Sequence, residues 1–120
     1  MTRRLVLALD LVSDAALIAD YENLHRPGGV WPEVLDHIRA SGVVEMQIWR
    51  VDDRMVMVAE VTDDYPRPTP AAQDEAVSRW ETLMWRFQKA LPAAQAGEKW
   101  RPMQPIFDLS QHEPLAGGME

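Results

Sequence analysis

The alternation of hydrophobic and polar positions predicts three strands in the first half of the chain. Residues 3–11 form a continuous apolar run, typical of a strand covered on at least one face. Residues 43–51 and 54–62 read as two further strands, and the short Asp52-Asp53 connection predicts that they form a hairpin. The first of these two is expected to present alternate residues to opposite faces: Val44, Met46 and Ile48 to one, Glu45, Gln47 and Trp49 to the other.

Helical spacing predicts three helices between and after these strands. The first is expected to begin near Ser13 as N-cap, with Asp14 in its first turn, and to end at Pro27-Gly28-Gly29. The second runs from Pro32 to about Gly42. The third is predicted over residues 72–91, with one apolar stripe of Trp80, Met84, Phe87 and Leu91.

A fourth strand is predicted over residues 99–109, where Pro102 and Pro105 favour an edge or a bulge. The resulting order of strand, two helices, two strands, helix and strand predicts an α+β fold of the ferredoxin-like, split βαβ type with an antiparallel sheet. Its helices cover one face of the sheet only. The other face carries Trp49 and further apolar side chains, so a second copy is expected to cover it in a homodimer.

Length and composition add limits to this picture. The chain of 120 residues predicts a single domain, over residues 1–109, followed by a loosely anchored tail over residues 110–120. The net charge of -7 and the lack of a basic cluster argue against a nucleic-acid partner. The apolar run from Leu5 to Leu9 is too short for a signal peptide or a membrane span, so no membrane association and a cytoplasmic location are expected.

Tyr21 and His25 are the first candidates for chemistry. They are four residues apart near the end of the first predicted helix, so they share one face of it. One interpretation is structural: a half-buried tyrosine, and a histidine that interacts favourably with the helix C-terminus. The other is an acid–base pair, because histidine exchanges protons near neutral pH and tyrosine donates to oxygen. The spacing alone leaves both open.

Other residues carry weaker signals. The five tryptophans are expected mainly in the core and the dimer interface, with an apolar platform for a sugar as the functional alternative. Glu60 lies inside an apolar strand, and its carboxylate either points to solvent or accepts hydrogen bonds in a pocket. The chain has no cysteine, and its three histidines lack metal-binding spacing, so no metal site is expected.

Several segments together resemble the L-rhamnose mutarotase family, and in particular its subgroup associated with L-fucose breakdown. They occur in matching order between about residues 4 and 109: YENLH, VWPEVL, ASGVVEMQIWR, MVMVAEV, RWETLM and GEKWRPMQPIFDL. Two departures from the rhamnose-type pattern favour fucose or a related sugar. Two more residues separate His25 from Trp31-Pro32-Glu33, and Glu81 stands where the rhamnose type has a second tryptophan.

The resemblance implies a dimeric α+β barrel without a cofactor and the interconversion of the α and β anomers of a 6-deoxyhexose. It assigns the catalytic pair to Tyr21 and His25, and the sugar-binding aromatic residue to Trp80. Besides these three residues, Trp31 and Glu60 are expected to bind the substrate. Because unrelated activities share this scaffold, a cofactor-free monooxygenase and a non-catalytic dimer that binds a small metabolite remain the alternatives.

Overall fold

An antiparallel sheet forms the centre of the computed structural model, which describes residues 1–114. Strand β1 (Thr2–Leu11) pairs with β3 (Arg54–Thr62), which pairs in turn with β2 (Val43–Val51). The other edge of β1 pairs with two short strands, β4 (Gln88–Lys89) and β5 (Arg101–Pro102). The order β2-β3-β1-β4 confirms the predicted ferredoxin-like arrangement.

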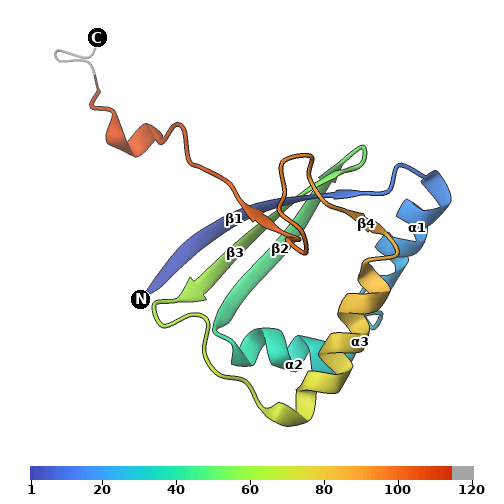
Figure 1. Cartoon of the computed structure of the whole chain (residues 1–120). Helices are drawn as coiled ribbons and strands as arrows, with labels where there is room; N and C mark the ends of the chain where they lie inside the picture. Colours follow the sequence, from blue (N-terminus) through green and yellow to red (C-terminus); the bar gives the residue numbers. More distant parts are fainter. Residues whose placement is uncertain (115–120) are drawn as a thin grey trace.

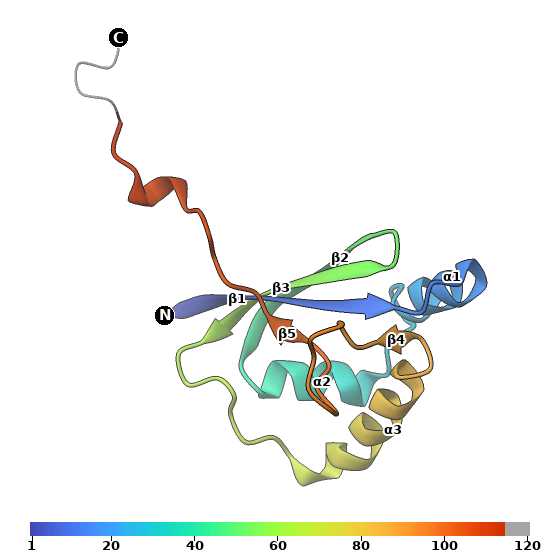
Figure 2. The same ribbon diagram turned by 45° about the horizontal axis from the view of Figure 1, so that its top comes forward.

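Three helices lie on one face of this sheet: α1 (Ala15–Leu24), α2 (Pro32–Ala40) and α3 (Asp74–Met84). Figure 2 shows α2 and α3 below the strands, and α1 at the end of the sheet where β1 finishes. The core between helices and sheet contains Leu9, Leu11, Tyr21, Val34, Met55, Trp80, Met84 and Phe87. No helix in residues 1–114 is long and apolar enough to cross a membrane.

The first helix begins one residue later than predicted and ends at Leu24, just before the predicted Pro27-Gly28-Gly29 break. Asp14 is its N-cap, because the Asp14 carboxylate accepts the backbone N–H of Leu17 at 3.0 Å, so the assignment of Ser13 was wrong. Beyond the helix the chain turns tightly, and the N–H of Gly29 donates to the carbonyl of Arg26 at 2.7 Å. A Cβ on Gly29 would lie 2.6 Å from the carbonyl oxygen of Leu24, so this turn requires glycine.

A bulge in β2 changes the face of one predicted residue. The pairing with β3 shifts between Val43 and Glu45, so Val44 does not share a face with Met46 as expected. Val43 is buried instead, in a small cluster with Ala59 and Val61, whereas Val44 is 56% exposed. The predicted hairpin is confirmed, with Val51 opposite Arg54.

The third helix is shorter than predicted, and the prediction of helix to residue 91 was wrong. It ends at Met84, and the chain turns back toward β1, where Gln88 pairs with Leu11. The carbonyl of Phe87 accepts the N–H of Val12 at 2.7 Å. Pairing with β1 therefore overrides the helical spacing, although Phe87 is buried as the apolar stripe required.

The predicted last strand is also much shorter, because only Arg101–Pro102 pairs with β1. The N–H of Met103 adds one more bond, to the carbonyl of Val6 at 2.8 Å. Beyond Met103 the chain leaves the sheet as an arm, residues 104–114, that includes the turn η2 (Leu109–Gln111) (Figure 1). Pro105 has no N–H with which to continue the pairing. Of the predicted tail, residues 115–120 lie outside the described residues.

Candidate active site

Helix α1 brings Tyr21 and His25 into contact at its C-terminal end. Tyr21 is one turn before the end, and His25 is the C-cap residue. The centroids of the phenol and imidazole rings are 4.2 Å apart and the rings are tilted by 36°. The predicted pair therefore exists as a contact between two groups that can hold protons.

The helix backbone fixes the tautomer of His25. Its Nδ1 lies 2.7 Å from the backbone carbonyl oxygen of Tyr21. A carbonyl oxygen only accepts hydrogen bonds, so Nδ1 carries the hydrogen and donates it. In the neutral imidazole this leaves Nε2 with a lone pair, ready to take a proton from a ligand.

The hydroxyl of Tyr21 is held by a residue from another part of the chain. The side-chain N–H of Gln88, on β4, donates to the Tyr21 hydroxyl oxygen at 3.1 Å, and both side chains are buried. Burial raises the pKa of Tyr21 above its ordinary value, the bond from Gln88 acts in the opposite direction, and the charge of Glu81 adds to the rise. The phenol is therefore protonated at neutral pH, and because no acceptor for its hydrogen is found among residues 1–114, it can donate to a ligand.

These two side chains open onto a cavity of about 290 Å³ between α1 and the hairpin. Its size is at the lower end of the range for small-molecule sites. The lining residues are Tyr21, Glu22, His25, Arg26, Ile48, Arg50 and Met55. Ile48 and Met55 supply an apolar wall, and the remaining side chains supply polar groups around it.

The two tryptophans predicted to bind sugar lie behind His25. The Trp80 ring meets the His25 imidazole edge to face, with a centroid distance of 5.8 Å, and meets Trp31 in the same way at 5.1 Å. Trp80 is only 6% exposed. The two tryptophans are thus next to the acid–base pair, although neither is among the residues that line the cavity.

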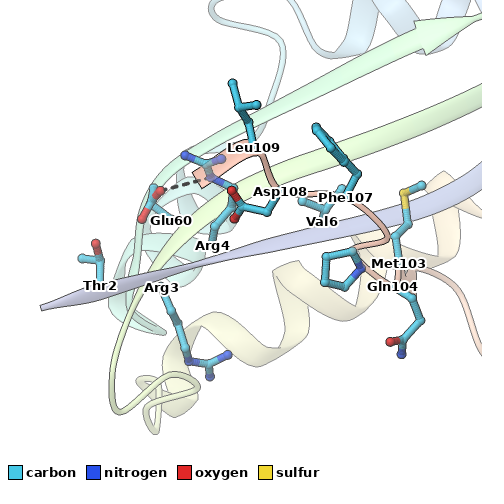
Figure 3. A pocket seen from close by; sticks show the side chains of 11 residues that line it. Thr2, Arg3, Arg4, Val6, Glu60, Met103, Gln104, Phe107, Asp108 and Leu109 are labelled. Atoms are coloured by element: carbon cyan, nitrogen blue, oxygen red, sulfur yellow. Dashed lines mark hydrogen bonds and ion pairs between the residues drawn. The ribbon is translucent and has the colours of Figure 1, made fainter. Parts of the chain in front are cut away.

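The structure does not bring Glu60 to this site. Glu60 pairs in register with Arg4 on the sheet face opposite the helices, and its carboxylate lies 3.5 Å from the Arg4 Nε. It lines a different cavity, of about 770 Å³, together with residues of the arm such as Phe107 and Asp108 (Figure 3). Its predicted role in substrate binding remains a prediction.

Six residues of the site were not predicted from the sequence: Gln88, which holds Tyr21, and the lining residues Glu22, Arg26, Ile48, Arg50 and Met55. Glu22 had a usable signal, because it precedes His25 by three residues and so shares a face of the helix with it. Gln88 had none, because residues 85–91 were assigned to a helix.

The fold and the site define a small α+β protein with a phenol–imidazole pair in a partly apolar cavity. This combination suits proton transfer between oxygen atoms of a small polar molecule.

Comparison with known proteins places the chain in a family of this class. A family model described as L-rhamnose mutarotase matches residues 4–109, and the chain belongs to this family. It is 50% identical over 112 residues to the L-fucose mutarotase of Xanthomonas campestris pv. campestris, covering 91% of this chain and 90% of that protein. It is 33% identical over 114 residues to a UPF0734 protein of Dictyostelium discoideum, covering 85% and 86%.

A solved structure shares the fold. The crystal structure of an L-rhamnose mutarotase from Formosa agariphila superposes with a TM-score of 0.64 at 20% identity, covering 88% of this chain and 97% of that one. The predicted resemblance to the mutarotase family is confirmed. The comparisons do not favour the two alternatives, a monooxygenase or a non-catalytic binding protein.

Proposed function

We propose that the protein interconverts the α and β anomers of a 6-deoxyhexose, L-fucose or L-rhamnose, by acid–base ring opening without a cofactor. The observation that carries the proposal is the contact between a phenol that can donate and an imidazole that can accept, in one cavity. Further support comes from the family, and from the 50% identity to a protein named L-fucose mutarotase.

The reaction needs one base and one acid. In the proposed mechanism, His25 Nε2 takes the proton from the anomeric hydroxyl, and Tyr21 donates its proton to the ring oxygen as the C1–O5 bond breaks. The open aldehyde rotates about C1–C2. Reclosure on the other face returns one proton from His25 to the anomeric oxygen and the other from the ring-closing hydroxyl to Tyr21. Each positioned acid–base group contributes about 10²–10⁴-fold.

Apolar surfaces in the cavity suit a deoxy sugar. In this proposal the C6 methyl group contacts Ile48 and Met55, which form the apolar wall. Trp80 and Trp31 are not part of the cavity lining but pack next to His25, where Trp80 restricts the rotation of the imidazole.

Saturation-transfer proton NMR on equilibrated L-fucose and L-rhamnose tests the function. Irradiating one anomeric proton should transfer saturation to the other anomer faster with the wild-type protein than in buffer. His25→Asn should remove at least 100-fold of the enhancement, because it removes the base. His37→Asn is the matched control: His37 lies on α2, outside the cavity, and its variant should exchange anomers at the wild-type rate. Exchange at the wild-type rate in folded His25→Asn would refute the assignment.

The working form is proposed to be a homodimer in which a second copy covers the sheet face opposite the helices. On this face Trp49 is 63% and Val51 68% exposed, and in the arm Ile106 is 96% and Phe107 68% exposed. Exposed apolar surfaces gathered on one side of a small domain mark an interface. Light scattering after size exclusion should give about twice the chain mass of 13.7 kDa. Trp49→Glu should lower the measured mass toward that of the monomer, and a monomeric wild-type protein would contradict the proposal. The cytoplasmic location stays a prediction.

A further inference from the structure

A second pair of side chains lines the cavity beside the acid–base pair. Glu22 follows Tyr21 on α1, and Arg50 is the second-last residue of β2. Arg50 Nε donates to Glu22 Oε2 at 2.9 Å, although 28 residues separate the two in sequence. Neither side chain has a part in the proton transfers proposed above.

The guanidinium of Arg50 is held from two sides. Besides the bond to Glu22, its Nη1 donates to the backbone carbonyl of Asp52 at 2.7 Å. That carbonyl belongs to the hairpin turn, where Asp52 takes a φ of 52°. The two bonds use two of the five N–H groups of the guanidinium, and no other partner of it is found among residues 1–114. The side chain is thus positioned in advance, with donors left over.

Within the part of the chain that the structure describes, the pair therefore presents donors without a partner next to an acceptor without one, the Oε1 of Glu22. A sugar hydroxyl is both a donor and an acceptor, so adjacent hydroxyls of a ring match such a pair. Hydrogen bonds from charged groups are stronger than those between neutral groups. Because the pair is neutral overall, it suits an uncharged ligand.

We propose that Glu22 and Arg50 bind ring hydroxyls of the sugar and determine which 6-deoxyhexose epimer the site accepts. This inference rests on the proposed function. The four sugars that test it have the same C6 methyl group and differ only at C2 and C4: L-fucose, 6-deoxy-L-talose, 6-deoxy-L-glucose and L-rhamnose. A hydroxyl of the wrong orientation leaves the charged groups without their partner, which is how a polar site rejects an analogue.

An ion pair that only stabilises the fold would behave differently. The Asp64–Arg67 pair is a suitable comparison, because Arg67 Nε lies 2.9 Å from Asp64 and both side chains are on the surface, outside this cavity. Removing such a pair changes stability slightly and does not change the choice between sugars.

The experiment measures kcat/KM for anomer exchange of the four sugars with wild-type protein, Glu22→Gln, Arg50→Gln and the control Arg67→Gln. For the preferred sugar, Arg50→Gln should lower kcat/KM by about 10- to 100-fold, mainly through KM, because a bond to a charged group is lost. The kcat/KM values of the disfavoured epimers should fall less. The ratio of kcat/KM between the best sugar and its C2 or C4 epimer should therefore fall about tenfold. Arg50→Lys, which keeps the charge, should restore part of the ratio, and Arg67→Gln should leave it unchanged.

The outcomes separate this inference from the function on which it rests. If the wild-type protein exchanges none of the four sugars faster than buffer, the proposed function fails. If it does exchange them, and both Glu22→Gln and Arg50→Gln keep the wild-type ratios while folded, the function stands and the role of this pair is refuted.

Discussion

Replacing Gln88 with leucine should separate activity from stability. Gln88 donates to the Tyr21 hydroxyl at 3.1 Å, and it is the hydrogen-bond partner that fixes this hydroxyl in the site. Without the bond, the phenol remains protonated, because burial raises its pKa in any case. The loss should therefore come from the orientation of the hydroxyl and not from its ionisation.

The expected magnitudes follow from the contacts of both ends of the Gln88 amide. A hydrogen bond of this kind contributes about 1 kcal/mol, which corresponds to about a fivefold loss of kcat/KM. Stability should change by less than about 1 kcal/mol, because Gln88 Oε1 is buried without a partner among the described residues, and leucine removes that uncompensated oxygen together with the bond.

A double-mutant cycle gives the sharpest measurement. Anomer exchange is measured by saturation transfer for wild-type protein, Gln88→Leu, Tyr21→Phe and the double variant, with unfolding in urea recorded for each. If Gln88 acts through the Tyr21 hydroxyl, Gln88→Leu should have no further effect on exchange once Tyr21 is phenylalanine. Gln73→Leu is the control, because Gln73 also has a buried, unpartnered Oε1 but lies at the start of α3, outside the cavity.

Two results would refute this reasoning. Equal losses from Gln88→Leu in the wild-type and Tyr21→Phe backgrounds would mean that Gln88 acts independently of the hydroxyl. A loss of several kcal/mol in stability would mean that Gln88 is mainly a structural residue.

Two further predictions concern the same helix end. The raised pKa of Tyr21 contributes stability that is fully present below the unfolded-state pKa of about 10 and is lost as pH rises through the folded-state pKa. The urea midpoint of the wild-type protein should therefore fall more between pH 8 and pH 11 than the midpoint of Tyr21→Phe. An equal fall in the two proteins would contradict this prediction. Gly29→Ala should destabilise the protein by about 1–3 kcal/mol and reduce anomer exchange, because the new Cβ would lie 2.6 Å from the Leu24 carbonyl oxygen beside His25. Unfolding and exchange at the wild-type values in this variant would instead show that the turn relaxes without moving the site.

Local signals were enough to predict most of the fold. The Pro27-Gly28-Gly29 break separates α1 from α2, and the two-residue connection after Val51 specifies the hairpin. Each of these features is decided by residues close in sequence. The order of the elements then leaves few arrangements of the sheet.

The errors occur where distant residues decide the structure. The spacing of Trp80, Met84 and Phe87 fits a longer helix, but the chain leaves the helix at Met84 because β1 offers backbone partners for Gln88 and Lys89. The bulge at Val44 is likewise a property of the pairing with β3. Neither strand partner can be read from the local pattern.

The same distinction applies inside the site. The contact between Tyr21 and His25 follows from their spacing, and the His25 tautomer follows from a carbonyl of the same helix. The orientation of the Tyr21 hydroxyl instead depends on Gln88, 67 residues away in sequence. The tautomer of the base is thus set within helix α1, whereas the hydroxyl of the acid is oriented only when β4 pairs with β1. A perturbation of that strand pairing should therefore impair the donor and leave the acceptor intact, which is why the Gln88 cycle tests the division of roles in this site most directly.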